Sequence, residues 1–290
     1  MTKPNFMMIG VAKAGTTSFF RYLDEHPQIF MCEIKATNYF GYEDARDWKW
    51  ADEGDAPLLQ NFPIRTLDAY EAVFEKATNE IAIGEVSPQY FRCPTAARRI
   101  HEYVPNAKLV LSLRNPADRA FSGFMMRTRR GEPVKGFYDE LTLNSSHVKE
   151  GFYYKRLKRY LDLFPKEQIK IYVFEEFKKN AAGIVADLYD FLGVDTSFTP
   201  DTSVKYNPGA VPKIRLFNKL FYNPRLIDMT KSVFPESMQG MFKQIRELNL
   251  TTSPKMPPDL RAELLNIYRE DILKLEDLLG RDLSIWRNTN

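Results

Sequence analysis

Residues 10 to 17 read Gly-Val-Ala-Lys-Ala-Gly-Thr-Thr and directly follow the apolar run from Phe6 to Ile9. A strand that enters a glycine-bearing turn and then a helix collects free backbone N–H groups and the positive end of the helix dipole at one point. Such a point suits a phosphate or sulfate group. We expect Gly15, Thr16 and Thr17 to supply these N–H groups.

The lysine of this loop stands three places earlier than in nucleotide triphosphatases. In their G-x-x-x-x-G-K-[ST] loop, the lysine reaches the β- and γ-phosphates and the hydroxyl residue coordinates magnesium. Here Gly10 and Gly15 keep that spacing, but Thr16 occupies the lysine position and Lys13 lies in mid-turn. The Lys13 ammonium would meet a bridging oxygen of a shorter anion, so a single 5′-phosphosulfate fits better than ATP. The alternative is an ordinary turn with a solvated lysine.

A second anion-binding element follows the apolar run at residues 108–113. Asn115 suits the N-cap of a helix, which places Arg114 at the carboxyl end of a strand, where open α/β sheets bind ligands. Ser122 follows less than two helical turns later. A guanidinium and a hydroxyl around a second phosphate imply a nucleotide with phosphates at two ends. The alternative is an ion pair between Arg114 and a nearby carboxylate such as Asp118.

One carboxylate, Glu85, follows the short apolar run at residues 81–83 and precedes aromatic residues. Burial in such surroundings disfavours the charged form, raises the pKa and makes the carboxylate a better general base. The alternative is a structural ion pair with Arg92 or Arg114. The three histidines lie at a helix end or in polar stretches, and we expect none of them to act as the base.

Apolar runs of strand length alternate with segments of helical spacing, which predicts an α/β fold: a P-loop-like, mostly parallel sheet flanked by helices. The expected strands are residues 6–11, 81–83, 108–113 and 168–174. The expected helices are residues 16–25, 117–129, 153–164 and 181–192, the last closed by Gly193, and a C-terminal helix between Pro258 and Gly280. We expect one domain over residues 1–290, in which a partly helical excursion at 201–258 covers the site as a lid.

The composition restricts the class of protein. A hydrophobic content of 44% in 290 residues fills a substantial core, and a net charge of +3 from 41 basic and 38 acidic side chains lacks the footprint of a nucleic-acid binder. No apolar stretch approaches the length that membrane insertion requires. The two cysteines, Cys32 and Cys93, are too few for a disulfide framework or a metal site and suit a reducing compartment. We therefore expect a cytoplasmic protein.

Taken together, the three elements resemble the sulfotransferases that use 3′-phosphoadenosine 5′-phosphosulfate (PAPS), in particular their bacterial and heparan-sulfate-type branch. The run Lys13-Ala14-Gly15-Thr16-Thr17 is similar to that family's 5′-phosphosulfate loop. Arg114 with Ser122 is similar to its 3′-phosphate element, an arginine followed eight residues later by a serine. The segment at residues 84–90 is similar to the one that carries the catalytic glutamate, which would be Glu85.

The resemblance implies PAPS as the sulfuryl donor, 3′-phosphoadenosine 5′-phosphate (PAP) as the product and no metal. It also places Lys35 at the acceptor-side rim and Tyr153 near the nucleotide. Either Lys213 or Arg215, in a late basic loop, would close over the 3′-phosphate. Other similar segments are residues 26–27, 34–40, 151–153 and 278–286. Three residues depart from the family's usual lysine, glutamate and histidine, so the acceptors of relatives are not carried over; these are Val86, Ala36 and Asn38.

The expected reaction is in-line transfer of a sulfuryl group to a hydroxyl or amine of a small-molecule or carbohydrate acceptor. Glu85 would act as the general base, and Lys13 would stabilise charge on the leaving phosphate. One alternative is a P-loop kinase or hydrolase in which Glu175 or Glu176 serves magnesium. Another is a nucleotide-binding module without catalysis. The sequence specifies neither the acceptor nor the oligomeric state.

Overall fold

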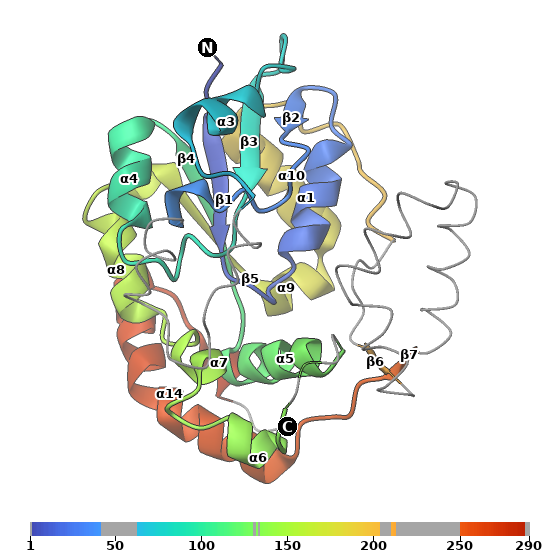
Figure 1. Cartoon of the computed structure of the whole chain (residues 1–290), viewed down its shortest axis with the longest axis vertical. Coiled ribbons are helices and arrows are strands. Elements are labelled where there is room, and N and C mark those ends of the chain that lie inside the picture. Colours follow the sequence, from blue (N-terminus) through green and yellow to red (C-terminus); the bar gives the residue numbers. More distant parts are fainter. Residues whose placement is uncertain are drawn as a thin grey trace.

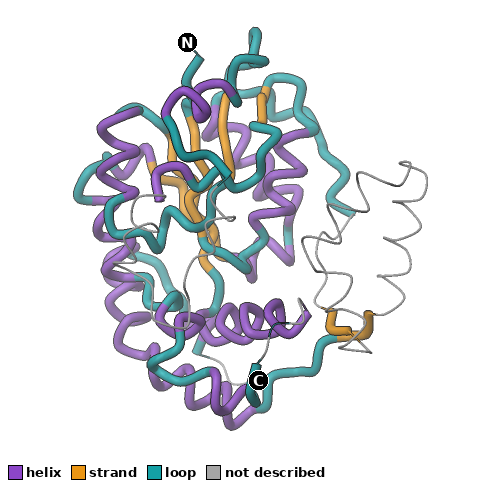
Figure 2. Tube along the Cα trace, in the orientation of Figure 1, coloured by secondary structure: helices purple, strands orange, loops and turns teal. Residues whose placement is uncertain are grey.

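The computed structural model describes residues 2–41, 63–129, 132, 134–203, 210–212 and 250–287. In this part of the chain five strands form one sheet and two more form a small separate sheet. The five-stranded sheet is a central layer with helices on both sides (Figures 1 and 2). The expected class, a parallel α/β sheet flanked by helices with a helical C-terminal region, is confirmed.

The order of the main sheet decides where a ligand can bind. Its strands are β1 (Phe6–Gly10), β2 (Ile29–Met31), β3 (Ala82–Val86), β4 (Lys108–Leu113) and β5 (Ile169–Val173). They lie in the order β2-β3-β1-β4-β5, and all neighbours run parallel. The chain leaves β1 toward β2 and β3 on one side, and leaves β4 toward β5 on the other. The carboxyl ends of β1 and β4 therefore flank the switch point, where open α/β sheets bind ligands.

Both faces of the sheet are buried, which explains why β1 is apolar at nearly every position. Phe6 and Met8 belong to one core, and Met7 and Ile9 to the other; all four are completely buried. The first core is closed by α1 (Thr16–Asp24), α9 (Phe174–Lys179) and α10 (Ala181–Leu192). The second is closed by α3 (Leu67–Ala72), α4 (Ala96–Tyr103), α5 (Pro116–Arg129), α8 (Tyr154–Leu161) and α14 (Pro258–Leu279).

Shorter elements complete the described part of the chain. They are α6 (Phe137–Glu140), α7 (Ser146–Lys149) and the 3-10 turns η1 (Tyr39–Gly41), η3 (Lys166–Gln168) and η4 (Ser284–Trp286). In Figure 1, α1, α9 and α10 lie to the right of the strands, α4 and α8 to the left, and α5 below the strands. Among the described residues no helix combines the length and the apolar character that crossing a bilayer requires.

The four predicted strands and the main predicted helices are present within a few residues, but two features differ. The strand expected at residues 81–83 runs on to Val86. The added residues include Gly84 and Glu85, which are uncommon in strands. Gly84 is accommodated directly under the Phe6 ring, where a Cβ would come within 2.4 Å of the ring. The sequence reasoning also missed β2, which has only three residues. The C-terminal helix includes Pro258 as its first residue.

Most of the predicted lid lies outside the described residues, including Lys213 and Arg215. Two short described stretches within it form β6 (Ala210–Pro212) and β7 (Leu250–Thr252), which pair antiparallel. The backbone of β6 lies beside α5 (Figure 1). This described part of the excursion therefore lies next to the helix that carries Ser122.

We expect Gly193→Ala to lower the free energy of unfolding by about 1 kcal/mol, because its φ of 83° is a left-handed conformation that costs any residue with a Cβ. Steric clash contributes little, since the nearest atom to that Cβ would be Lys108 Nζ at 3.9 Å. Urea denaturation measures the change. Gly136→Ala, at φ −64°, is the matched control. Equal destabilisation of both variants would show that the left-handed backbone of Gly193 is not the cause.

Candidate active site

The turn between β1 and α1 has the geometry of an anion cradle. Gly15 is the N-cap of α1 with a φ of 81°, and a Cβ there would meet the Phe174 ring at 2.9 Å, so only glycine fits. Lys13 also has a positive φ, 75°. Such strained backbone clusters at functional sites. Thr16 and Thr17 open the helix, where amide N–H groups lack intrahelical acceptors and favour an anion.

Hydrogen bonds from the end of β4 hold this loop in place. Ser112 Oγ donates to the Ala14 carbonyl at 2.7 Å, and Arg114 Nη1 donates to the Lys13 carbonyl at 2.8 Å. The Lys13 ammonium reaches Met126 Sδ on α5 at 3.5 Å. Met126 lies one helical turn after Ser122. The structure therefore brings Lys13, Arg114 and the face of α5 that carries Ser122 to the switch point of the sheet.

Arg114 is partly buried against its neighbours, and one of its N–H donors has no hydrogen-bond partner. Its Cζ lies 5.0 Å from the centroid of the Phe174 ring, and the hydroxyl of buried Tyr153 donates to its carbonyl at 2.9 Å. Burial lowers the pKa of Arg114, and its buried Nε has no hydrogen-bond partner. A partly buried guanidinium with an unpaired N–H fits an anionic group such as a phosphate. The carboxylate of Asp118 instead lies 3.5 Å from Arg261.

The start of α5 is tied to two distant segments. Asn115 Oδ1 accepts two backbone N–H groups of α5, as predicted for an N-cap. Its own N–H donates to Glu175 Oε1 at 3.1 Å, and the Trp286 indole donates to Glu175 Oε2 at 2.9 Å. Glu176 forms an ion pair with Arg281. Both carboxylates that the kinase alternative assigns to magnesium thus have structural partners, which counts against that alternative.

Glu85 lies inside β3, as its fourth residue, rather than after the strand as expected, and it is completely buried. The hydroxyls of Tyr70 and Tyr90 donate to Oε1 at 2.7 and 2.9 Å. Ser87 Oγ donates to Oε2 at 2.7 Å, and Thr37 Oγ1 donates to the same oxygen. Burial raises the pKa of Glu85, and the four hydrogen bonds partly oppose that effect. We call these four residues the hydroxyl cage.

The hydroxyl cage replaces the ion pair that was the structural alternative for Glu85. Arg92 instead pairs with Glu150, and Arg114 contacts the Lys13 carbonyl. Ser87 and Tyr90 lie in the segment that the sequence analysis singled out. Thr37 lies in the similar segment at residues 34–40, but nothing in the sequence marked it as a partner of Glu85, and Tyr70 lies outside the segments singled out. Both reach Glu85 from other parts of the chain.

One loop, at residues 32–38, touches both the anion cradle and the hydroxyl cage. Lys35 Nζ donates to Thr17 Oγ1, while Thr37, two residues on, donates to Glu85. Although part of the Lys35 side chain is exposed, desolvation of its ammonium lowers its pKa to about 8. Lys35 therefore lies against the loop predicted to hold the donor, and its placement on the acceptor side stays a prediction.

A cluster of three charged side chains, Arg92, Arg119 and Glu150, links α5 to the segment before Tyr153. Arg119, 1% exposed, donates to Glu150 Oε2 at 2.7 Å, and Arg92 contacts the other oxygen. Burial of Glu150 would raise its pKa, but the guanidinium groups of Arg92 and Arg119 hold that pKa at about 2. Glu150 directly precedes the segment that carries Tyr153. The cluster thus ties α5 to the residues that hold the Arg114 carbonyl.

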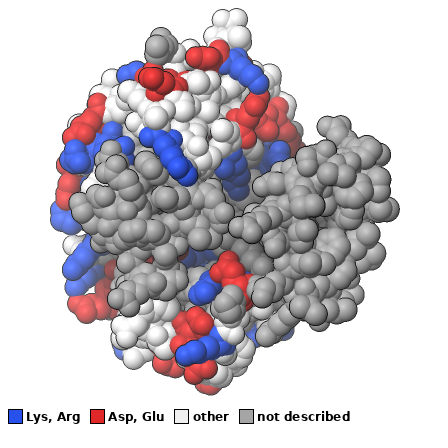
Figure 3. All heavy atoms as spheres, viewed as in Figure 1, with Lys and Arg blue, Asp and Glu red and all other residues white. Residues whose placement is uncertain are grey.

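Two basic side chains, Arg127 on α5 and Lys158 on α8, form ion pairs with neighbouring carboxylates. Arg127 pairs with Glu132 and Glu140, and Lys158 pairs with Asp162. On the face in Figure 3, positive and negative side chains of the described residues are interspersed.

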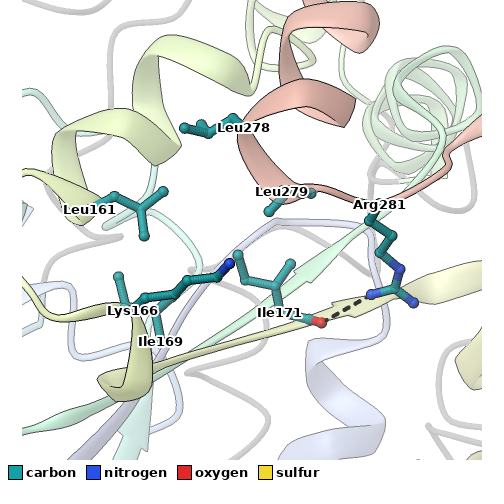
Figure 4. A pocket seen from close by; sticks show the side chains of 7 residues that line it. All are labelled: Leu161, Lys166, Ile169, Ile171, Leu278, Leu279 and Arg281. Carbon is teal, nitrogen blue, oxygen red and sulfur yellow. Dashed lines mark hydrogen bonds between the residues drawn. The ribbon is translucent and has the colours of Figure 1, made fainter.

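A separate cavity of about 200 Å³ lies between α8, β5 and α14 (Figure 4). Its lining residues are Leu161, Lys166, Ile169, Ile171, Leu278, Leu279 and Arg281. None of them belongs to the anion cradle, the Arg114 element or the hydroxyl cage. The cavity is therefore not part of the candidate active site.

Comparison with known proteins agrees with this geometry. The model of the sulfotransferase family matches residues 4–199, more than half of the chain. Among solved structures, a sulfotransferase from Alicyclobacillus acidocaldarius is 31% identical, with a TM-score of 0.74, and the match covers 99% of this chain and 100% of that one.

Curated relatives are more distant. The bifunctional heparan sulfate N-deacetylase/N-sulfotransferase 2 of Bos taurus is 27% identical over 96% of this chain and 30% of its own length. The corresponding enzyme 3 of Mus musculus is 24% identical over 98% of this chain and 31% of its own length. The chain thus spans about a third of the length of these relatives.

Proposed function

This chain belongs to the sulfotransferase family, and we propose that it transfers a sulfuryl group from PAPS to a hydroxyl or amine of a small-molecule or carbohydrate acceptor. The observation that carries the proposal is the contact between two elements at the switch point, where Arg114 Nη1 donates to the backbone carbonyl of Lys13 at 2.8 Å. Glu85 lies on the adjacent strand, paired in register with Met7 of β1. The proposal is that these two cationic groups hold the donor beside the strand that carries the buried base.

In this proposal the loop after β1 and the start of α5 bind different groups of PAPS. The first amides of α1 and the Lys13 ammonium hold the 5′-phosphosulfate, while Arg114 and Ser122 hold the 3′-phosphate. Tyr153 acts through Arg114, whose carbonyl its hydroxyl binds. The proposed donor-binding residues are Lys13, Ala14, Gly15, Thr16, Thr17, Arg114, Ser122 and Tyr153, together with Lys213 or Arg215.

In the proposed reaction the acceptor attacks sulfur in line with the departing 5′-phosphate. Glu85 takes up the acceptor proton, which its raised pKa favours. Lys13 and the fixed amides stabilise the charge that develops on the leaving phosphate. The leaving group has no β,γ-phosphate bridge for magnesium to span, so the proposal needs no metal.

We propose a chemical class of acceptor and a cellular compartment, and no individual acceptor. The curated relatives carry N-sulfotransferase in their names, which supports a carbohydrate acceptor among the candidates. Val86, Ala36 and Asn38 differ from the family's usual residues near the acceptor, so heparan sulfate itself is not assigned. Location in the cytoplasm is supported by two buried cysteines without a disulfide, Cys32 and Cys93.

The test of the function is an incubation with PAPS and EDTA against a panel of alcohols, phenols, amines and oligosaccharides. Mass spectrometry should find PAP together with an acceptor heavier by one SO₃ group. ATP turnover that EDTA abolishes would favour the kinase alternative. Tight PAP binding without transfer to any acceptor would favour the binding module.

We expect Glu85→Gln to lower kcat by about 100-fold or more, because the general base is lost, while the Kd for PAP stays unchanged. Burial raises the pKa of Glu85, and only its ionised form accepts a proton. The kcat of the unaltered enzyme should therefore fall as the pH drops through that raised value, and steady-state kinetics measures both effects. Glu102→Gln, at an exposed ion pair on α4, is the matched control. Normal turnover of Glu85→Gln would remove Glu85 from its role.

Replacing Arg114 should weaken binding of the 3′-phosphorylated nucleotide selectively. Arg114→Gln removes the charge but keeps an amide that can donate to the Lys13 carbonyl. Loss of a charged hydrogen bond predicts a rise in the Kd for PAP of about 10-fold or more, with little change for 5′-AMP. Calorimetry measures both, and Arg98→Ala on the surface of α4 serves as the control. An equal loss for PAP and 5′-AMP would contradict the assignment.

A further inference from the structure

The hydroxyl cage leaves Glu85 no direct place for a substrate proton. A carboxylate has about four lone-pair sites. Two hydroxyls donate to Oε1 and two to Oε2, so each oxygen already accepts two hydrogen bonds. In this arrangement Glu85 gains a proton only from one of its own four donors, and that donor must take a replacement from the acceptor.

Three of the four hydroxyls are poorly suited to that exchange. Ser87 Oγ already accepts the backbone N–H of Asn38 at 3.1 Å while it donates to Glu85. Tyr70 and Tyr90 are completely buried, as Thr37 is, but only the two tyrosine rings pack against Phe40 in an aromatic cluster. Their phenol groups are therefore tied to the core behind Glu85.

Thr37 is the remaining donor and has the position that the exchange requires. Its Oγ1 lies 3.0 Å from the Tyr90 hydroxyl and 3.3 Å from Ser87 Oγ. Because both of those groups give their hydrogens to Glu85, Thr37 Oγ1 keeps a lone pair for a further hydrogen. Thr37 also belongs to the loop whose Lys35 touches Thr17 at the anion cradle. It is thus the cage residue joined most directly to the predicted donor site.

The backbone around Thr37 is held in place on both sides. Ala36 and Asn38 have φ values of 65° and 53°, in the left-handed region that residues with a Cβ seldom adopt. Strained backbone persists where the surrounding structure fixes it. Here the Ala36 N–H donates to the Val86 carbonyl at 3.0 Å, and the Asn38 N–H donates to Ser87 Oγ. Thr37 is therefore clamped against the end of β3.

We propose that Thr37 relays the acceptor proton to Glu85, an inference that rests on the proposed function. As the acceptor atom bonds to sulfur, its proton passes to Thr37 Oγ1, and the proton of that hydroxyl passes to Glu85 Oε2. The bond between sulfur and the 5′-phosphate oxygen breaks, and its electron pair leaves with PAP. Thr37 ends unchanged, Glu85 ends protonated, and solvent takes up that proton before the next turnover.

The experiment compares three variants by steady-state kinetics with PAPS and by calorimetry with PAP. Thr37→Val keeps the shape and removes the hydroxyl, while Thr37→Ser keeps the hydroxyl. Tyr70→Phe is the matched control, because it removes another single donor from the same carboxylate. We expect Thr37→Val to lower kcat by about 30-fold or more with an unchanged Kd for PAP, as for loss of a general-base path. Thr37→Ser should recover most of the rate, and Tyr70→Phe should lose much less than Thr37→Val.

Two results would overturn the relay: near-normal kcat in Thr37→Val, or equal losses in Thr37→Val and Tyr70→Phe. Should Thr37→Val fail to bind PAP, Thr37→Ala takes its place with the same expectation. Failure of the relay is distinguishable from failure of the proposed function. An inactive Glu85→Gln beside an active Thr37→Val rejects only the relay, whereas an active Glu85→Gln rejects Glu85 as the base.

Discussion

The hydrogen bond from Arg114 Nη1 to the Lys13 carbonyl joins the two halves of the sheet where the strand order reverses. It holds the loop after β1 against the end of β4, so the left-handed backbone at Lys13 is kept in place. The Arg114 backbone is in turn fixed by the Tyr153 hydroxyl. Asn115, the next residue, is bound by Glu175 and by the Trp286 carbonyl. The end of the sheet proposed to bind the anion thus depends on segments that are far apart in the described chain.

The second constraint is the burial of Glu85. An ionised carboxylate that is removed from water needs compensation by hydrogen bonds or an opposite charge. Here four hydroxyls supply it, from Thr37, Tyr70, Ser87 and Tyr90. Because neutral donors offset desolvation less than a cation would, the pKa of Glu85 stays raised, which suits a base. The same arrangement makes proton transfer depend on the hydroxyls themselves.

Local sequence was sufficient for the elements that carry the anion-binding groups. The apolar run before Gly10 predicted β1, and Asn115 predicted the start of α5, because a strand's burial and a helix cap are decided by neighbouring residues. The sequence-based prediction failed where contact with a residue distant in the sequence changes the structure that the neighbouring residues favour. The Phe6 ring over Gly84 extends β3 through Glu85, although Gly-Glu looks like the end of a strand. The same holds for Glu175 and Glu176, whose partners Trp286 and Arg281 lie more than 100 residues away.

The sequence by itself determined the parallel α/β class, the anion loop with its displaced Lys13, the Arg114 element and the choice of Glu85 as the candidate base. These features depend on residues that are close together in the sequence, because the burial pattern of a strand and the cap of a helix are decided by neighbouring residues. Only the tertiary structure decided that Thr37 and Tyr70 surround Glu85, that Lys35 lies against Thr17, and that Arg114 contacts the Lys13 carbonyl. Hydrogen bonds between side chains depend on distance in space, and the order of the strands sets that distance.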